Sequence, residues 1–268
     1  LNCIVLTKDA HPGTPEFAVF IQEVRKEMTV KCGQKCTAIR RIIVPEAYID
    51  DVQIQIGKAL DSVVIGDPRK EGVRMGALAG KAQLAEVKGK VDDLLAYSSL
   101  VYGNMEQYEI ALGDKEKGAF LAPILLRNDH PFEHTGSHEI EAFGPVSTLM
   151  PYKEIEDAIE LSKMGKGSLC STIVTYDDRI AVDYTVQAAT HHGRILILNR
   201  EAAKESTGHG SPMPMLVHGG PGRAGGGEEM GGMRGIKHYM QRCAIQGTPT
   251  TITAIARQYQ YGARYIEH

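Results

Sequence analysis

Apolar residues recur along the chain with two spacings, one typical of strands and one typical of helices. Residues 3–6 form a short apolar run that predicts a buried strand, and residues 39–44 predict a second strand that stops at Pro45. Between these strands, apolar side chains recur at helical spacing and predict a helix over residues 15–30. Those side chains are Phe17, Phe20, Ile21, Val24 and Met28. The order strand, helix, strand is that of an α/β unit.

The same alternation continues to residue 199. Further helices are predicted through Tyr48, Val52 and Ile56, and over residues 79–96, 153–164 and 178–190. Further strands are predicted at residues 63–65, 118–126, 145–150, 170–175 and 194–199. Because strands and helices alternate, the predicted fold class is α/β, with a mostly parallel sheet covered by helices.

Glycine changes the pattern after residue 204. Residues 205–235 hold many of the 29 glycines, which predicts an irregular loop with a short helix near residues 231–241 after it. The tail is apolar again at residues 243–246 and 250–256, and both stretches are strand-like. Because no helix is predicted after it, this tail is expected to pair with the sheet edge of a partner chain.

Composition narrows the class of protein. Hydrophobic residues make up 43% of the 268 residues and charged residues 24%, which is the balance of a soluble globular protein. A net charge of −3, no tryptophan and 6% aromatics argue against nucleic acid or an anionic membrane surface as a partner. No apolar run reaches the ~20 residues that span a bilayer, and Asp9, His11 and Pro12 interrupt any leader-like start.

The five cysteines form no disulfide framework, because their number is odd and their spacing irregular. They indicate free thiols in a reducing, cytoplasmic compartment. The chain opens on Leu1 and an apolar run and ends abruptly at His268, so we expect it to be a piece of a longer protein.

Cys36 is the candidate nucleophile. It lies between a predicted helix end and a predicted strand start, and Lys35, Arg40 and Arg41 nearby would favour the reactive thiolate. The alternative is that Cys36 is a small buried hydrophobic residue, as most cysteines are. A second alternative is zinc held by two pairs of ligands, Cys32 with Cys36 and His134 with His138, but this spacing is loose and we predict no metal.

Two other segments attract attention on chemical grounds. Residues 141–146 read Glu-Ala-Phe-Gly-Pro-Val, which taken alone is a helix-to-strand corner with a solvated Glu141. The glycine-rich segment suggests a phosphate cradle, but no Gly-Lys-Ser/Thr follows it, so it is not a P-loop. A surface loop or lid is the expectation for that segment.

Four short strings together resemble the aldehyde dehydrogenase superfamily in their order and their intervals. They are residues 33–36 (Gly-Gln-Lys-Cys), 66–68 (Gly-Asp-Pro), 141–146 (Glu-Ala-Phe-Gly-Pro-Val) and 193–199 (Gly-Arg-Ile-Leu-Ile-Leu-Asn). The resemblance implies a three-layer catalytic domain over residues 1–242, without the nicotinamide-binding domain. It implies an oligomerisation arm over residues 243–268, whose residues 243–256 add a strand to a neighbouring subunit in a homo-oligomer.

The resemblance also implies a mechanism and a cofactor. The thiolate of Cys36 attacks an aldehyde, a hydride passes to NADP or NAD, and the resulting thioester is hydrolysed. In this scheme Glu141 binds the nicotinamide ribose hydroxyls and Phe143 packs beside the nicotinamide ring. The family's cofactor turn, its second oxyanion donor and its general-base Glu have no counterpart in the sequence, so we expect these 268 residues alone to be inactive.

Residues 203–212, 218–229 and 237–242 resemble one branch of the superfamily, the bifunctional enzymes of phenylacetate degradation, which act on a ring-opened, CoA-linked semialdehyde. The semialdehyde dehydrogenases of benzoyl-CoA degradation have a similar glycine-rich loop, and the two branches stay open at this point. Two other classes of function also stay open: a cofactor-independent thiol acyltransferase or hydrolase that pairs Cys36 with a histidine, and a non-catalytic oligomerisation module.

Overall fold

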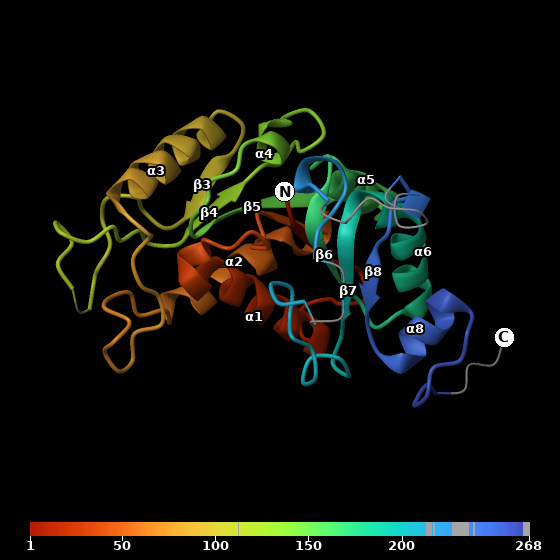
Figure 1. Ribbon diagram of the computed structural model, residues 1–268. Coiled ribbons are helices and arrows are strands. Elements are labelled where there is room, and N and C mark those ends of the chain that lie inside the picture. Colours follow the sequence, from red (N-terminus) through yellow and green to blue (C-terminus); the bar gives the residue numbers. More distant parts are fainter. Residues whose placement is uncertain (112, 213–215, 217, 227–235, 238, 265–268) are drawn as a thin grey trace.

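A single eight-stranded sheet runs through the molecule (Figure 1). The computed structural model describes residues 1–111, 113–212, 216, 218–226, 236–237 and 239–264. Its strands are β1 (Cys3–Leu6), β2 (Arg41–Pro45), β3 (Ser99–Tyr102), β4 (Ile124–Arg127), β5 (Val146–Tyr152), β6 (Ser168–Val174), β7 (His192–Leu198) and β8 (Ala244–Gln246). They lie in the order β3-β4-β5-β2-β1-β6-β7-β8, and all neighbours are parallel except β3 and β4. The predicted α/β class with a mostly parallel sheet is confirmed.

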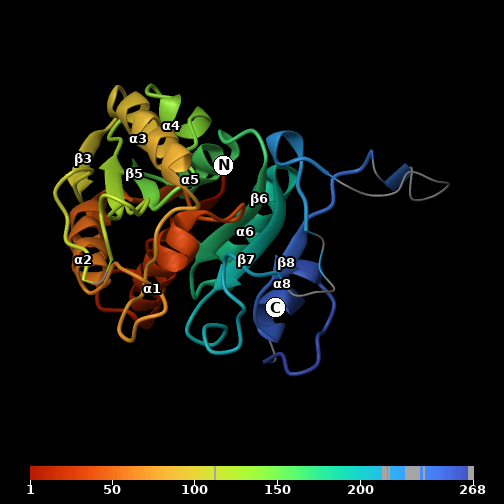
Figure 2. The same ribbon diagram turned by 60° about the vertical axis from the view of Figure 1, so that its left-hand side comes forward.

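Helices cover both faces of this sheet. They are α1 (Pro15–Thr29), α2 (Ile49–Asp61), α3 (Lys81–Leu95), α4 (Gly136–Glu139), α5 (Ile155–Lys163), α6 (Asp178–Ala188) and α8 (Pro249–Ala256). The described residues also contain 3₁₀ turns at Val30–Gly33, Glu46–Tyr48, Ala189–His191 and Gly222–Ala224. Figures 1 and 2 show α1 and α2 on one side of the sheet and α5 and α6 on the other.

The alternation of side chains along β1 explains the layers. Ile4 and Leu6 pack into the apolar cluster formed with α1 and α2, whereas Cys3 and Val5 pack into the cluster formed with α5 and α6. Successive residues of a strand point to opposite faces, so a strand buried on both faces is apolar at every position. That is why residues 3–6 read as one continuous apolar run.

A second part of the core lies beyond β5. There, Val87, Val91 and Leu94 of α3 pack with Ile124 and Leu126 of β4. The antiparallel strand β3 closes this end of the sheet. At the other end, α8 lies beside α6, where the Thr251 hydroxyl donates a hydrogen bond of 2.6 Å to Asp178 (Figure 1).

Several predicted elements were wrong. Residues 63–65 form only an isolated bridge between Ile65 and Met75, and residues 250–256, predicted as strand, lie in helix α8. Strand β3 was not predicted, and only Ile124–Arg127 of the stretch predicted at 118–126 is strand. Part of the glycine-rich segment, and residues 231–235 and 238 of the helix predicted near 231–241, lie outside the described residues.

The terminal strand β8 is part of this chain's own sheet. β8 lies parallel to β7 of the same chain, with Ala244 opposite Arg194 and Gln246 opposite Leu196. It therefore extends its own sheet and forms one end of it. The helix α8 that follows it begins at Pro249, with the Thr248 hydroxyl accepting a hydrogen bond from the Thr251 amide. None of the helices in the described residues is long and apolar enough to cross a membrane.

Candidate active site

A cavity of about 230 Å³ lies at the amino-terminal edge of the parallel strands. Its lining comes from residues that precede or begin four strands: Asn2 before β1, Cys36 before β2, Phe143 before β5 and Ser168 at the start of β6. Because these strands are adjacent and parallel, segments far apart in the sequence meet at this edge.

The structure brings the three predicted site residues together. Cys36, Glu141 and Phe143 all line this one cavity, although more than 100 residues separate the first from the other two. Phe143 also lines a neighbouring cavity of about 600 Å³, together with Gln34, Arg74 and other residues. The phenyl ring therefore stands between two hollows, one of which holds the thiol.

The backbone before Cys36 is strained. Lys31 and Cys32 have left-handed φ values of 53° and 54°, and Gly33 follows with φ of 66°. A Cβ atom on Gly33 would overlap the carbonyl oxygen of Gly144. Two of the four strings that carry the family resemblance thus touch each other, and the contact requires a residue without a Cβ at position 33. Non-glycine residues in this conformation cost energy and cluster at functional sites.

Arg40 connects the two segments of the site. Its guanidinium donates hydrogen bonds of 2.7 Å to the Gly33 carbonyl and 2.6 Å to the Gly144 carbonyl. Its Nε lies 3.4 Å from a carboxylate oxygen of Glu141, and its charged head lies 5.2 Å from the centre of the Phe143 ring. The arginine is buried, so it holds the thiol loop and the Glu141–Gly144 segment in one arrangement.

Asn2 connects the thiol loop to the sheet. Its side-chain amide donates hydrogen bonds of 2.8 Å to the Cys36 carbonyl and 3.1 Å to the Ala38 carbonyl. Its side-chain oxygen accepts hydrogen bonds from the backbone amides of Leu169 and Cys170. All four polar partners are backbone groups, so Asn2 fixes the course of the chain on either side of the thiol.

Exposure distinguishes Cys36 from the other four cysteines. Cys3, Cys32 and Cys170 are buried, Cys243 is half-buried, and Cys36 is exposed. Burial raises the pKa of Cys32 and of Cys170 to about 12, so both thiols stay protonated at neutral pH. The interpretation of Cys36 as a buried apolar residue is wrong.

The basic residues expected to favour a thiolate have other partners. Lys35 lies 2.6 Å from the buried carboxylate of Glu27. Arg41 donates hydrogen bonds to the carbonyl oxygens of Leu1, Leu161 and Ser162. Arg40 binds the carbonyls of Gly33 and Gly144. No contact among the described residues therefore supports the prediction that Lys35, Arg40 and Arg41 favour the thiolate of Cys36.

The proposed zinc ligands do not gather either. Cys32 packs in the apolar cluster beside α3. Both ring nitrogens of His138 are occupied, Nδ1 by Arg41 at 3.1 Å and Nε2 by the Pro131 carbonyl at 2.9 Å. In the part of the chain that the structure describes, no three His, Cys, Asp or Glu side chains are grouped in a way that could hold a metal ion.

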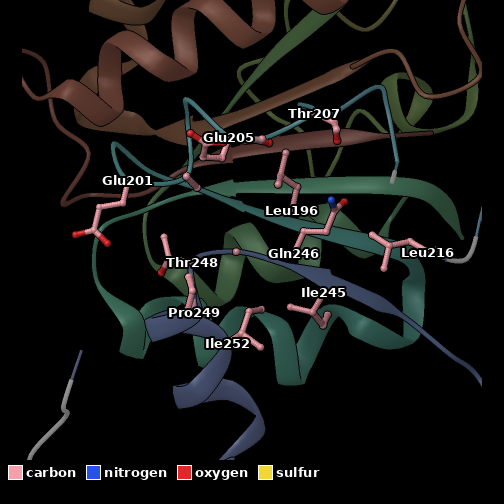
Figure 3. A pocket seen from close by; sticks show the side chains of 13 residues that line it. Leu196, Glu201, Glu205, Thr207, Leu216, Ile245, Gln246, Thr248, Pro249 and Ile252 are labelled. Carbon is pink, nitrogen blue, oxygen red and sulfur yellow. The ribbon is translucent and has the colours of Figure 1, made fainter. Parts of the chain in front are cut away.

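Another cavity, of about 370 Å³, lies at the carboxyl ends of β7 and β8. Figure 3 shows Leu196, Gln246 and Ile245 beneath the segment that carries Glu205 and Thr207. None of the predicted site residues lines it. The carboxyl edge is the usual ligand edge of an open parallel sheet, yet in this protein the thiol, Glu141 and Phe143 lie at the opposite edge.

Sequence reasoning missed two residues of the thiol site. Asn2 gave no signal, because an asparagine before a strand is common, and its role depends on the adjacency of β1, β2 and β6. His218 was one of ten histidines in the sequence; its Nε2 lies 3.9 Å from the Cys36 sulfur. Its position depends on a loop that returns to the strand edge.

The sequence of this chain matches a known protein family. Residues 13–245 match the aldehyde dehydrogenase family. This match covers most of the chain and includes the thiol loop and the Glu141–Val146 segment.

The chain belongs to the aldehyde dehydrogenase family.

Two curated relatives of this aldehyde dehydrogenase chain are informative. Protein MaoC of Klebsiella aerogenes is 48% identical over 197 residues, which are 72% of this chain and 56% of that protein. The 3,4-dehydroadipyl-CoA semialdehyde dehydrogenase of Aromatoleum evansii is 37% identical over 221 residues, 82% of this chain and 43% of the enzyme. The chain thus spans about half the length of the curated relatives it matches.

Solved structures show the same fold. Aldehyde dehydrogenase C of Pseudomonas syringae, determined with NAD⁺ and octanal, superimposes with a TM-score of 0.68 at 20% identity, covering 84% of this chain and 42% of the other. Succinic semialdehyde dehydrogenase of Streptococcus pyogenes, determined with NADP⁺, has a TM-score of 0.68 at 21% identity, covering 84% and 44%. The α/β domain predicted from the sequence is therefore the architecture found in aldehyde dehydrogenases.

Proposed function

We propose that this chain supplies the thiol site of an NAD(P)-dependent aldehyde dehydrogenase that oxidises an aldehyde to its acid through Cys36. The observation that carries the proposal is the meeting of an exposed thiol, a carboxylate and an aromatic ring in one cavity of a family member. Among the described residues that line this cavity, Cys36 is the one cysteine, and we assign it as the thiol nucleophile.

In the proposed reaction the Cys36 sulfur attacks the carbonyl carbon of the aldehyde and forms a thiohemiacetal. The new oxyanion needs a hydrogen-bond donor, and we assign this role to the backbone N–H of Cys36. Asn2 holds the Cys36 carbonyl at 2.8 Å and so orients this peptide segment. After loss of hydride, the thioester on Cys36 is hydrolysed by water and the thiol is released.

The residues present suit a nicotinamide cofactor. When bound, NAD(P) accepts the hydride. Glu141 is 39% exposed, and its carboxylate accepts hydrogen bonds, which is the chemistry that ribose hydroxyls require. Phe143 offers a ring between the two cavities. Arg40 restrains both side chains, and we propose that it sets their positions for the cofactor.

For the substrate we propose a CoA-linked semialdehyde of phenylacetate degradation. The support is twofold: the strings at 203–212, 218–229 and 237–242, and a relative named for a CoA-linked semialdehyde. The benzoyl-CoA branch, which has a similar glycine-rich loop, is the alternative source of a CoA-linked semialdehyde. Both NAD and NADP are compatible with a carboxylate that binds the nicotinamide ribose. Five free cysteines support the predicted cytoplasmic location.

We also propose that the chain forms a homo-oligomer through residues 243–256. β8 is the last strand of the sheet in the described residues, and its outer edge is therefore open to a second copy. The pairing of its inner edge with β7 fixes the strand in an extended form that a partner strand can join.

The test is aldehyde-dependent NAD(P)H formation by the longer protein that contains this chain, wild type beside Cys36→Ala. We expect at least a thousandfold loss of kcat in the variant, because the covalent route is removed, with the circular dichroism spectrum unchanged. Cys243→Ala is the matched control and is expected to keep its activity. If Cys36→Ala retains its activity, the proposed function of Cys36 is wrong. The 268 residues alone are expected to produce no NAD(P)H.

A further inference from the structure

His218 lies beside the thiol although the chain brings it from 182 residues away. Its Nε2 is 3.9 Å from the Cys36 sulfur, at the long end of hydrogen-bond distances to sulfur, and both side chains are exposed. In ligand-free enzymes such contacts are often long and shorten when substrate binds. A cysteine beside an imidazole is a common arrangement in which the histidine activates the thiol as a nucleophile.

The segment after His218 is tied to the same strand edge. A Cβ atom on Gly193 would overlap the carbonyl oxygen of Gly219, so the loop lies directly on the start of β7. The Arg223 amide donates a 3.0 Å hydrogen bond to Lys166, and its guanidinium donates to the carbonyls of His138 and Glu139. These backbone contacts fix the loop that presents His218 to the thiol.

We propose that His218 is the proton acceptor of Cys36. In this step the S–H bond breaks, the proton moves to Nε2 of the neutral imidazole, and the electron pair stays on sulfur, giving a thiolate beside an imidazolium. This inference rests on the proposed function, in which Cys36 is the nucleophile, and it adds the group that activates it. Lys35, Arg40 and Arg41 do not take this role, because a cationic side chain has no lone pair that could accept the proton, and each binds another partner.

Other charged groups face the thiol and must be constant in any test. Glu141 and Arg223 border the cavity, and Lys35 lies on the same loop, paired with Glu27. A comparison of variants at position 218 leaves all of these groups in place.

The experiment is alkylation of Cys36 by iodoacetamide from pH 5 to pH 10, followed for this residue by peptide mass spectrometry. In the measured reaction a sulfur–carbon bond forms and iodide leaves, so the rate follows the thiolate. The chain is used as it is, in wild type and His218→Gln. His11→Gln is the matched control. His11 is also exposed, and its ring contacts the carbonyl of the next residue, Pro12.

We expect the His218→Gln rate to be about tenfold lower at pH 7 and equal to wild type near pH 10, because a strongly alkaline solution removes the need for an internal proton acceptor. His11→Gln should follow the wild-type curve throughout. Superimposable curves for wild type and His218→Gln would overturn the proposal, and so would an equal loss at every pH, which indicates a displaced loop. Since no aldehyde or cofactor takes part, failure here is distinct from failure of the Cys36→Ala assay.

Discussion

Gly33 and Gly144 come from distant parts of the sequence and touch in the fold. The contact is close enough that a methyl group on Gly33 would overlap the Gly144 carbonyl oxygen, and the φ of 66° at Gly33 is one that L side chains rarely adopt. Arg40 then binds both carbonyls. A buried arginine and two glycines therefore hold the thiol loop against the Glu141 segment.

This contact predicts the effect of Gly33→Ala. A left-handed alanine costs about 1–2 kcal/mol, and the overlap with Gly144 costs about 1–3 kcal/mol more, so the free energy of unfolding should fall by about 2–5 kcal/mol. Gly89→Ala is the matched control, because Gly89 lies in α3 with open space around its Cβ position, and it should stabilise by about 0.5–1 kcal/mol. Urea unfolding measures both. A neutral Gly33→Ala would contradict the proposed packing.

At the scale of elements, buried polar groups connect helices to strands. His138 of α4 accepts a hydrogen bond from Arg41 of β2 at Nδ1 and contacts the Pro131 carbonyl through Nε2. A protonated ring would carry a proton on Nδ1 that faces the guanidinium. Burial, and then the charge of Arg41, lowers the pKa of His138 from 6.5 to about 4.

A lowered histidine pKa predicts how stability depends on pH. Between pH 6.5 and 4 the unfolded chain binds a proton at His138 and the folded chain does not, so the folded state loses stability as pH falls through this window. The free energy of unfolding falls by about 1.4 kcal/mol per pH unit, or about 3 kcal/mol over the whole window. Above pH 6.5, His138 makes no contribution to the pH dependence. His138→Gln should flatten the slope by this amount in urea unfolding at each pH. His192 and His209, whose pKa values burial also lowers, are unchanged in that comparison. Parallel slopes would show that His138 does not titrate in this way.

At the scale of the whole molecule, β8 is the last strand at one end of the sheet in the residues that the structure describes. If residues 243–256 join two copies, the chain should elute as an oligomer in size-exclusion chromatography, and a chain that ends at residue 242 should elute as a monomer. Tyr261→Ser is the control, because Tyr261 is 97% exposed and lies outside the proposed segment, and it should elute like wild type. Association that survives the truncation would exclude this arm as the interface.

The sequence predicted the fold where apolar periodicity was long and unbroken. Helix α1 and strands β5, β6 and β7 lie where they were expected, because a strand buried on two faces and a helix buried on one leave distinct patterns. Residues 250–256 were wrongly predicted as a strand, because β-branched threonine and isoleucine favour strands. Their helix depends on the Thr248 cap and on packing against α6, neither of which a local pattern contains.

The sequence by itself determined the family, the α/β class and the three residues expected at the thiol site, because short strings in a fixed order identify a family without reference to space. The tertiary structure decided which side chains support that site. Arg40, Asn2 and His218 take their partners from strands and loops that become neighbours only when parallel strands align at one edge. Contacts between distant segments depend on the order of strands in the sheet, and periodicity along one chain does not encode that order.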